Sequence, residues 1–407
     1  MRSKLGIYPR GFWVLLVCFF VNRIGAALVW PYLALFMREQ TGAPLSTVTA
    51  LLSLQALASV LGTSAISVVM DRVGRKKPML VGLVAFSAIL LLMSGARGIE
   101  QWLVLIPLYG ILQPVFYVGA NAMVADLVQP DERTNAYAIV RTGSNLAIAV
   151  GAAIGGFVVA QSHLYSYQMT AVINVLLVIP VALLIRESLP KGRVTQQETV
   201  RGGYGQIFRD RPFVLFIGVF TLLEIAAALV FNLMSVYTKE NFGMPENEYG
   251  MLLGINATMV VLFQYGVTQV SRRAAPLVVL GVGALFYTMG LSGYALAQSF
   301  PHFALGMVVM TIGEMMVAPT SNGLVANMAP TDMRARYMGI YSLTYTMGTG
   351  VGPVVGGLLS GAFAPAAIWY GGAFTALLAA VGFFALARDR QIEARASVSR
   401  VASEKVG

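Results

Sequence analysis

Long apolar runs alternate with short breaks of polar, Gly or Pro residues along the whole chain. A helix that crosses a lipid bilayer needs about 20 consecutive, mostly apolar residues. The pattern therefore predicts an all-α membrane protein with twelve transmembrane helices. We place these helices at residues 12–37, 46–70, 78–97, 102–128, 136–161, 167–186, 212–238, 247–270, 276–297, 302–328, 336–361 and 366–387.

The longest polar interval, residues 187–211, separates six predicted helices from six others. We therefore expect an N-terminal six-helix bundle at 1–186, a cytoplasmic linker at 187–211, a C-terminal six-helix bundle at 212–387 and a cytoplasmic tail at 388–407. The tail is rich in polar residues, which predicts a solvated and partly disordered end.

Composition agrees with this pattern. The 407 residues are 57% hydrophobic and only 11% charged, whereas a soluble protein has roughly 25% charged residues. Most of the 28 Lys and Arg residues lie in alternate predicted loops, which indicates that both termini are cytoplasmic. The net charge of +10 is thus spread over many loops, so we expect no nucleic-acid partner.

Residues that commonly bind metals are scarce. The chain has one cysteine, Cys18, and two histidines, His163 and His302, none of them in a metal-ligand spacing. We interpret both histidines as interfacial residues and expect no metal site. No Walker A sequence is present either, so we expect no cofactor and no direct use of ATP.

The two halves of the chain resemble each other at an offset of 201 residues. This offset relates Asn121 to Asn322, and it relates Arg23 to Glu224 and Gln113 to Glu314. A duplication of six helices predicts two related bundles around a central substrate cavity. Further matches at this offset are Ala125 with Ala326, Asp131 with Asp332, Arg133 with Arg334, Gly151 with Gly352, Gly155 with Gly356 and Gly156 with Gly357.

Three charged residues lie about 12 residues, or roughly 18 Å, inside their predicted helices: Arg23, Glu224 and Glu314. A charge near the middle of the bilayer costs at least about 2.5 kcal/mol, so it is normally paired or functional. One interpretation is a static ion pair between Arg23 and Glu224. The other is proton coupling, because burial favours the protonated carboxyl and a nearby arginine favours the ionised form. We expect Glu314 to be the principal proton-coupling residue, Glu224 the second and Arg23 its modulator.

Small residues recur every four positions on two predicted helices. They let helix backbones approach closely. This indicates either packing alone or a contact that yields during transport, between the fifth and eighth helices and between the eleventh and second. The two series are Gly143, Ala147, Gly151 and Gly155, and Thr344, Gly348, Gly352 and Gly356.

The loop after the second predicted helix reads Asp71-Arg72-Val73-Gly74-Arg75-Lys76-Lys77. It resembles the loop signature G-x-x-x-D-R-x-G-R-[KR] of the major facilitator superfamily, with Ser67 in place of the first glycine. The resemblance implies that Asp71 sits near the N-terminus of the eleventh helix and that Arg75 pairs with Asp126. Asp71, Arg72, Gly74 and Arg75 would then form a cytoplasmic latch. The alternative is a solvated turn that only sets topology.

Two glycine-rich stretches extend the resemblance to the drug:proton antiporter branch of that superfamily. They resemble its G-P-x-x-G-G antiporter motif, although the proline lies in the eleventh helix and not in the fifth. The arginine usual in the fourth helix is missing, but residues 119–126 and 313–315 are similar to multidrug exporters of the LmrP type. The motif residues are Gly151, Gly155, Gly156, Gly352, Pro353, Gly356 and Gly357.

These features together predict a secondary transporter that exports amphipathic or cationic small molecules in exchange for protons, by alternating access. We expect a monomer in a bacterial cell (inner) membrane, whose partners are the bilayer, protons and the substrate. Asp126 is either an inner proton exit or a partner of Arg75 and Arg141. The residues expected to contact substrate are Asn22, Tyr32, Gln113, Tyr117, Asn232, Asn256, Tyr341 and Tyr345.

Two alternatives stay open. One is a proton-coupled carrier of a single solute or lipid, and the other is a membrane sensor or assembly factor that transports nothing. An enzyme is not expected, because the predicted helices contain no paired carboxylates, no Ser/His arrangement and no His-rich metal spacing.

Overall fold

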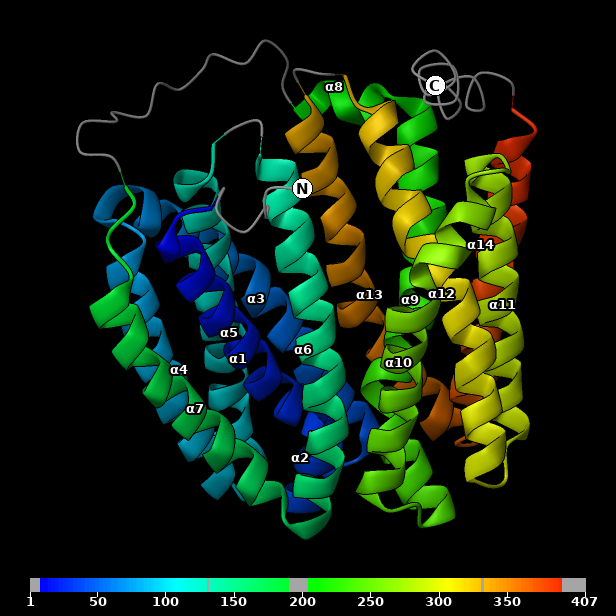
Figure 1. Cartoon of the computed structure of the whole chain (residues 1–407). Coiled ribbons are helices and arrows are strands. Elements are labelled where there is room, and N and C mark those ends of the chain that lie inside the picture. The colour runs from blue at the N-terminus through cyan, green and yellow to red at the C-terminus, as the bar shows by residue number, and fades with distance from the viewer. Residues whose placement is uncertain (1–7, 130–131, 190–203, 331–332, 390–407) are drawn as a thin grey trace. The chain divides into compact units, whose positions relative to one another are not determined.

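The computed structural model describes residues 8–129, 132–189, 204–330 and 333–389, which form helices joined by short turns and no strand (Figure 1). The predicted all-α fold is confirmed. The chain divides into two compact units. The first contains Met1–Gln196 and Gly243–Ala257, and the second contains Gln197–Phe242 and Thr258–Gly407. Each unit is described by itself below.

The first unit contains the helices of the N-terminal half and the beginning of one later helix. Pro31 cannot donate a backbone hydrogen bond, and the first long helix changes there into a short 3-10 turn. The elements are α1 (Arg10–Val29), η2 (Trp30–Tyr32), α2 (Leu33–Thr41), α3 (Leu45–Val73), α4 (Lys76–Gly95), α5 (Ile99–Leu127), α6 (Arg133–Gln161) and α7 (His163–Leu184).

The second unit contains the remaining helices. Its first element, α8, lies in the interval predicted to be a linker, where the sequence pattern gave no helix. The elements are α8 (Tyr204–Arg209), α9 (Arg211–Phe242), α10 (Glu246–Ser271), α11 (Pro276–Leu296), α12 (Phe300–Met328), α13 (Arg334–Ala362) and α14 (Ala367–Ala387). The beginning of α10, up to Ala257, groups with the first unit.

Each predicted transmembrane segment matches a long helix, or the α1–α2 run, within about one helical turn at either end. Among the described residues, 11 helical runs are long and apolar enough to cross a membrane. The exception is α13, which is 29 residues long but begins with Arg334 and Arg336 and is rich in glycine. The tail beyond residue 389, most of the linker and the Asp131–Asp332 match lie outside the described residues.

The internal repeat is visible in the helix contacts. In the first unit α1 packs against α6 and α7, and α4 packs against α5 and α7. In the second unit the equivalent helices pair in the same way: α9 with α13 and α14, and α11 with α12 and α14. Even single hydrogen bonds repeat, since the Nδ2 atoms of Asn121 and Asn322 donate to the carbonyls of Tyr117 and Ala318 at 2.9 and 2.7 Å.

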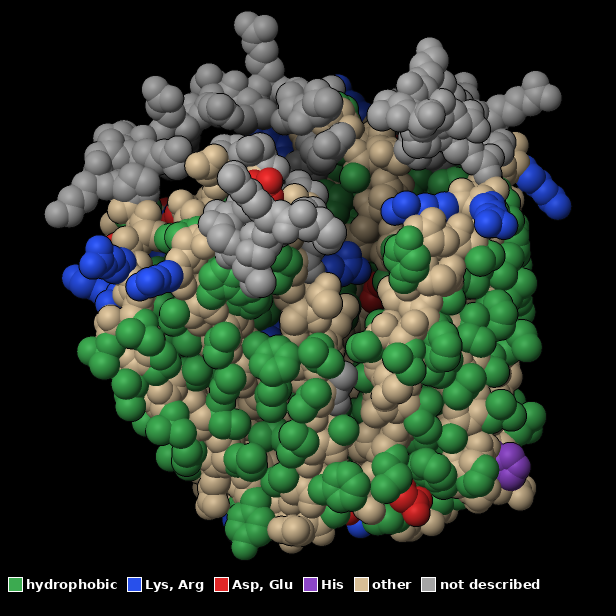
Figure 2. Space-filling model, in the orientation of Figure 1, with side chains coloured by type: hydrophobic (Ala, Val, Ile, Leu, Met, Phe, Trp, Pro, Cys, Tyr) green, Lys and Arg blue, Asp and Glu red, His purple; other side chains and the backbone are tan. Residues whose placement is uncertain are grey.

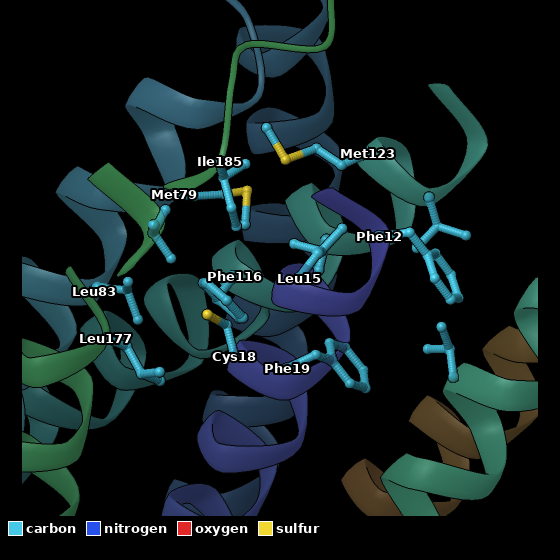
Figure 3. Packing of buried hydrophobic residues seen from close by; sticks show 14 of the residues in the cluster. Phe12, Leu15, Cys18, Phe19, Met79, Leu83, Phe116, Met123, Leu177 and Ile185 are labelled. Carbon is cyan, nitrogen blue, oxygen red and sulfur yellow. The ribbon is translucent and has the colours of Figure 1, made fainter. Parts of the chain in front are cut away.

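Apolar side chains from α1, α4, α5, α6 and α7 fill the interior of the first unit at its Phe12 end. Figure 3 shows Phe12, Leu15, Cys18 and Phe19 of α1 pointing into this cluster. Cys18 is buried and unpaired, as expected from a single cysteine. The cluster holds α1 against the helices that position the charged groups described below.

The outer surfaces of the helices are also apolar. Large side chains such as Leu183, Val81 and Leu262 are 77%, 68% and 65% exposed. Figure 2 shows hydrophobic side chains over much of the visible face, with Lys and Arg gathered toward one end of the helices. A soluble protein rarely exposes continuous apolar surface of this extent, whereas a bilayer solvates it favourably. The chain is therefore a multi-pass membrane protein.

The glycine series on α6 and α13 have partners that partly correct the sequence prediction. A Cβ added at Gly151 would lie 2.6 Å from the carbonyl of Ile24, and one at Gly352 would lie 2.8 Å from that of Ile225. The series therefore faces α1 in the first unit and α9 in the second. The expected approach of the fifth predicted helix to the eighth is present at Gly156, where an added Cβ would lie 2.8 Å from the Cα atom of Gly250, and the contact between the eleventh and second predicted helices stays a prediction.

Replacing Gly352 with alanine tests this packing. We expect Gly352→Ala to lower the midpoint of thermal unfolding in detergent by several degrees, because overpacking against backbone costs about 1–3 kcal/mol. Gly266→Ala on α10 is the matched control, since its Cβ would meet nothing within 4 Å. An equal midpoint in the two variants would contradict the close approach of α13 to α9.

Candidate functional site

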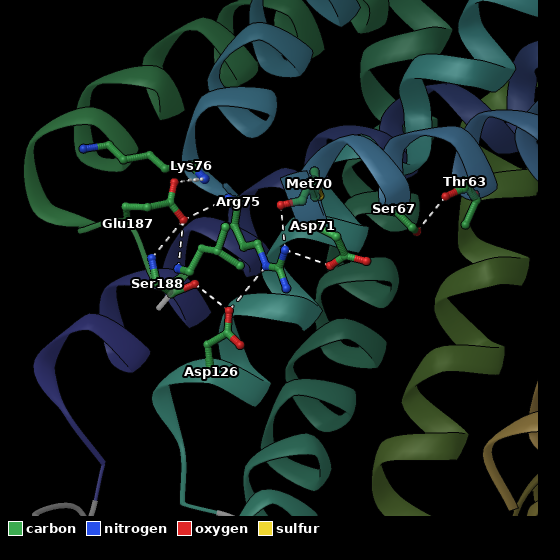
Figure 4. Close-up of polar contacts among 10 residues, drawn as sticks. Thr63, Ser67, Met70, Asp71, Arg75, Lys76, Asp126, Glu187 and Ser188 are labelled. Atoms are coloured by element: carbon green, nitrogen blue, oxygen red, sulfur yellow. Dashed lines mark hydrogen bonds and ion pairs between the residues drawn. The ribbon is translucent and has the colours of Figure 1, made fainter. Parts of the chain in front are cut away.

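The turn between α3 and α4 is built around the side chain of Arg75 (Figure 4). Its Nη1 atom lies 2.8 Å from Asp71 Oδ1 and donates to the carbonyl of Met70 at 2.6 Å. Its Nε atom lies 3.4 Å from Asp126 Oδ2, in the geometry of an ion pair and not of a hydrogen bond. The expected Arg75–Asp126 pair is thus present, and it joins α3 to the end of α5.

The two ion pairs of Arg75 differ in exposure. The side chains of Arg75 and Asp126 are each 11% exposed, whereas Asp71 is 59% exposed. An exposed pair contributes little to stability, but removing one partner of a buried pair leaves an uncompensated charge. Ser188 Oγ also donates to Asp126 Oδ2 at 2.8 Å. Asp126 therefore acts here as a structural partner of Arg75, and its role as a proton exit stays a prediction.

Glu187, just after α7, fixes the same turn, and the sequence reasoning missed it. Its carboxylate accepts backbone hydrogen bonds from Arg75 and Lys76 at 2.9 and 3.1 Å. It also accepts from the backbone of Ser188 and Leu189. Partial burial raises the pKa of Glu187, but these four hydrogen bonds outweigh it and leave the pKa below its usual value.

Gly74 is required where it stands for two reasons. Its φ angle of 103° lies in a region that other residues rarely adopt. An added Cβ would also lie 2.5 Å from Glu187 Oε2. The glycine of the loop motif therefore lets the carboxylate of Glu187 reach the first backbone amides of α4. Arg72, also in the predicted latch, lies exposed on the last turn of α3.

Arg23 lies inside α1, where it contacts residues of α1, α5 and α6. Its Nε atom donates to Ser144 Oγ on α6 at 3.2 Å. Its guanidinium carbon lies 5.2 Å from the ring centre of Tyr117 and 6.0 Å from that of Phe19. These contacts offset part of the cost of a charge among apolar helices. The expected pair with Glu224, a residue of the second unit, stays a prediction.

Two carboxyl groups interact in the second unit. Glu224 on α9 and Glu314 on α12 are both half-buried, and their charges interact. The buried phenol of Tyr287 on α11 interacts electrostatically with both carboxyl groups. The sequence analysis found no carboxylate pair in the helices, because Glu224 and Glu314 are 90 positions apart and no local spacing reveals their interaction.

The residues predicted to contact substrate fall into different environments. Tyr32 is buried, with its ring edge-on to Tyr249 at 5.4 Å, so it packs against α10. Asn22 donates to Asn174 Oδ1 at 2.8 Å, which joins α1 to α7. Both side chains are thus occupied by packing inside the first unit. Tyr117 and Tyr345 are the exposed members of the set, at 44% and 64%.

The other four members are half-buried. Tyr341 shares a hydrogen bond with Ser321 Oγ at 2.7 Å, and Asn232 donates to the carbonyl of Ala228 at 2.8 Å. Gln113 and Asn256 are half-buried on α5 and α10. Contact of these residues with a substrate stays a prediction.

The expectation of no metal site stays a prediction, but three possible ligands lie close together among the described residues. His163, Glu39 and Glu246 hold their ligand atoms within 4.8 Å of one another. These residues come from α7, α2 and α10, so the sequence shows no ligand spacing between them.

Comparison with known proteins decides the family. A model of the Major Facilitator Superfamily matches residues 15–344 and 231–404, which is most of the chain. The chain belongs to the Major Facilitator Superfamily. It is therefore a membrane transporter of the superfamily's type, as the loop motif around Asp71 indicates.

Individual relatives of this superfamily are distant. The chain is 26% identical to an uncharacterised transporter, YttB, of Bacillus subtilis (strain 168), over 86% of this chain and 88% of the relative. It is also 26% identical to a Na(+), Li(+), K(+)/H(+) antiporter of Planococcus maritimus, over 94% and 95%. A multidrug resistance protein, MdtH, of Cronobacter sakazakii is 25% identical over 71% of both chains.

Solved structures show the same superfamily fold. The nucleoside transporter NupG superimposes with a TM-score of 0.78 at 14% identity, covering 94% of this chain and 100% of that one. A transporter of the POT family in complex with a thioalcohol-conjugated peptide gives a TM-score of 0.76 at 15% identity, covering 94% and 97%. At these identities the likeness concerns the fold alone.

Glu187→Gln tests the anchoring of the turn. We expect faster hydrogen exchange at the backbone amides of Arg75, Lys76 and Ser188, because glutamine cannot replace both carboxylate oxygens as acceptors. The lowered pKa sets the sign of the pH dependence. The stabilisation is complete above the unfolded pKa of about 4.5 and is lost as the pH falls through the lowered folded value.

The difference in thermal midpoint between the wild type and Glu187→Gln should therefore be largest near neutral pH and vanish in acid. Glu100→Gln, at an exposed position in the first turn of α5, is the control. Unchanged amide exchange in Glu187→Gln at neutral pH would show that the carboxylate does not hold the turn.

Proposed function

We propose that this superfamily member is a proton-coupled antiporter that exports amphipathic or cationic small molecules by alternating access. The observation that carries this proposal is the pair formed by Glu224 and Glu314, together with Tyr287, inside the helices of the second unit. Packing alone gives no reason to keep two interacting carboxyl groups among apolar side chains, because burying charge is costly.

The chemistry of the pair suits coupling. Two carboxylates close together in a medium of low dielectric repel each other strongly, so the pair is most stable when it holds one proton or one cation. A cationic substrate and a proton then compete for the same negative charge. Proton entry releases the substrate, and substrate binding releases the proton.

The membrane supplies energy for export in two ways. A monovalent cation exchanged for one proton is driven by the pH gradient, because no net charge crosses, whereas export of a neutral solute is also driven by the membrane potential. One proton moving inward gains about 2.3 kcal/mol for each 100 mV of potential. That energy corresponds to roughly a 50-fold concentration gradient of an exported neutral solute. A carrier with one coupled proton can therefore maintain a modest outward gradient without a cofactor. The names of two relatives, a multidrug resistance protein and a cation/proton antiporter, support the proposal.

A second candidate function is exchange of a monovalent metal cation for protons. It is favoured by the antiporter of Planococcus maritimus, whose similarity extends over 94% of this chain. Carboxylate oxygens also bind small metal cations, so the same pair offers a site for such an ion. A proton-coupled carrier of one solute or lipid and a non-transporting sensor are the remaining alternatives.

The turn around Arg75 would serve the conformational cycle. We propose that Asp71, Arg72, Gly74 and Arg75 form a latch on the cytoplasmic side, with both termini on that side. The support is the contact of Arg75 with Asp126 and the anchoring of the turn by Glu187. A turn that only set topology would not need an arginine held by α3, by the end of α5 and by Glu187 after α7.

Glu314→Gln tests the coupling role. We expect it to abolish substrate transport driven by a pH gradient in proteoliposomes, while detergent-solubilised protein still binds a lipophilic cation, because glutamine keeps the shape but cannot exchange a proton. Glu240→Gln, at the exposed end of α9, is the matched control and should transport normally. Uphill transport by Glu314→Gln at the wild-type rate would rule out its assignment as the coupling residue, whereas a wild type that transports no substrate at all would favour the sensor.

The substrate class is tested by proton release from acidified everted vesicles. We expect a panel of lipophilic cations to dissipate the pH gradient and to compete with one another, because one acidic pair serves them all. Na⁺, Li⁺ and K⁺ are added separately at equal ionic strength. A response to these ions alone would favour the second candidate, and a response to one organic solute would favour the specific carrier.

A further inference from the structure

Three side chains that could bind a metal meet in the first unit, and none of them belongs to the acidic pair or to the Arg75 turn. Glu39 lies near the end of α2, His163 is the first residue of α7 and Glu246 is the first residue of α10. His163 Nε2 lies 3.1 Å from Glu39 Oε2 and 4.0 Å from Glu246 Oε1. One ligand atom of each residue lies within 4.8 Å of the other two.

The cluster is largely removed from solvent. The side chains of His163 and Glu246 are only 11% and 10% exposed, and that of Glu39 is 37% exposed. The ring of Phe36 stacks on that of His163, with centres 5.4 Å apart and planes 21° apart. The imidazole is therefore held in one orientation by this stacking.

Both ring nitrogens of His163 are buried without a hydrogen bond to any described residue. This is unusual, because a buried polar atom without a partner costs about 1–3 kcal/mol. The missing hydrogen bond is more unusual because Glu39 Oε2 lies only 3.1 Å from His163 Nε2. A small rotation of either side chain would align the two atoms for a hydrogen bond. The arrangement needs an explanation other than a direct bond between His163 and Glu39.

Metal coordination explains it. In a tetrahedral zinc site with bonds of about 2.0–2.1 Å, neighbouring ligand atoms are roughly 3.3 Å apart. The metal occupies the lone-pair direction of the ring nitrogen, so each oxygen ligand lies roughly 35° or more to its side. The short distance from Nε2 to Glu39, without hydrogen-bond alignment, fits this geometry. The longer distances to Glu246 need only a modest inward movement of its carboxylate.

We propose that His163, Glu39 and Glu246 form a binding site for a divalent transition-metal ion of the Zn²⁺ class. One imidazole and two carboxylates suit such ions, whereas Ca²⁺ and Mg²⁺ require six or more oxygen ligands. The two carboxylates balance the charge of the ion, and a water molecule completes four-fold coordination. The bound ion ties the first turn of α10 to α2 and α7, so it stiffens this part of the unit.

The experiment uses full-length protein, with any affinity tag removed because a His-tag binds zinc. Binding of Zn²⁺ is titrated calorimetrically near neutral pH in detergent. We expect one site per chain in the wild type and an affinity at least tenfold weaker in His163→Ala and in Glu246→Gln. His302→Ala is the matched control, since it removes the only other histidine of the sequence and should bind as the wild type does.

A second measurement keeps the test decisive if His163→Ala fails to fold. Zinc X-ray absorption of the wild type should show one imidazole nitrogen with oxygen ligands and no sulfur, and Zn²⁺ should raise the thermal midpoint of the wild type but not of Glu39→Gln. Equal affinity in the wild type and His163→Ala, loss of binding in His302→Ala, or sulfur coordination by Cys18 would each overturn the site. None of these outcomes depends on whether the protein is a proton-coupled exporter.

Discussion

Repulsion between two carboxyl groups inside a membrane-spanning bundle is the interaction on which the proposed transport depends. Glu224 and Glu314 lie on different helices and share their surroundings with the buried Tyr287. Water would screen such a pair, but apolar helices do not, so in the proposed mechanism a proton or a cation relieves the repulsion. A site that alternates between those two occupants couples the two fluxes by competition, without any other chemical step.

The rest of the fold can be understood as the support for this pair. The stretch of α9 around Glu224 is fixed by α13, since an added Cβ at Gly348 would lie 2.6 Å from the carbonyl of Glu224. Helix α12 packs closely against α11 in the same manner, because a Cβ added at Gly313 would lie 2.5 Å from the carbonyl oxygen of Gly283. Glycine contacts on both sides thus position the two carboxyl groups through close backbone packing.

The two duplicated halves share the same helix packing but have different charged residues at equivalent positions. Equivalent glycines, Gly151 and Gly352, place α6 on α1 and α13 on α9. At the position equivalent to Glu224 the first unit has Arg23, which contacts Ser144 and Tyr117. The repeat therefore maintains the packing, while single substitutions at equal depth make one unit cationic and the other acidic.

The sequence predicted what depends on local patterns and missed what depends on contacts between distant helices. Apolar periodicity located the helices, the 201-residue offset located the repeat, and a family motif paired Arg75 with Asp126 correctly. It missed the meeting of Glu224 with Glu314 and the grouping of His163 with Glu39 and Glu246, because those residues are far apart in the chain. The glycine series was recognised, but its direction around the helix could not be fixed from spacing alone.

Infrared difference spectroscopy of the carboxyl groups during a pH titration of purified protein tests the central claim most directly. We expect a protonated-carboxyl band that titrates in the wild type. This band should be lost or shifted in both Glu224→Gln and Glu314→Gln, because the two carboxyl groups share one proton. We also expect that a bound substrate cation removes this band at constant pH. A band that is unchanged in both variants, or that does not respond to any cation, would contradict the account.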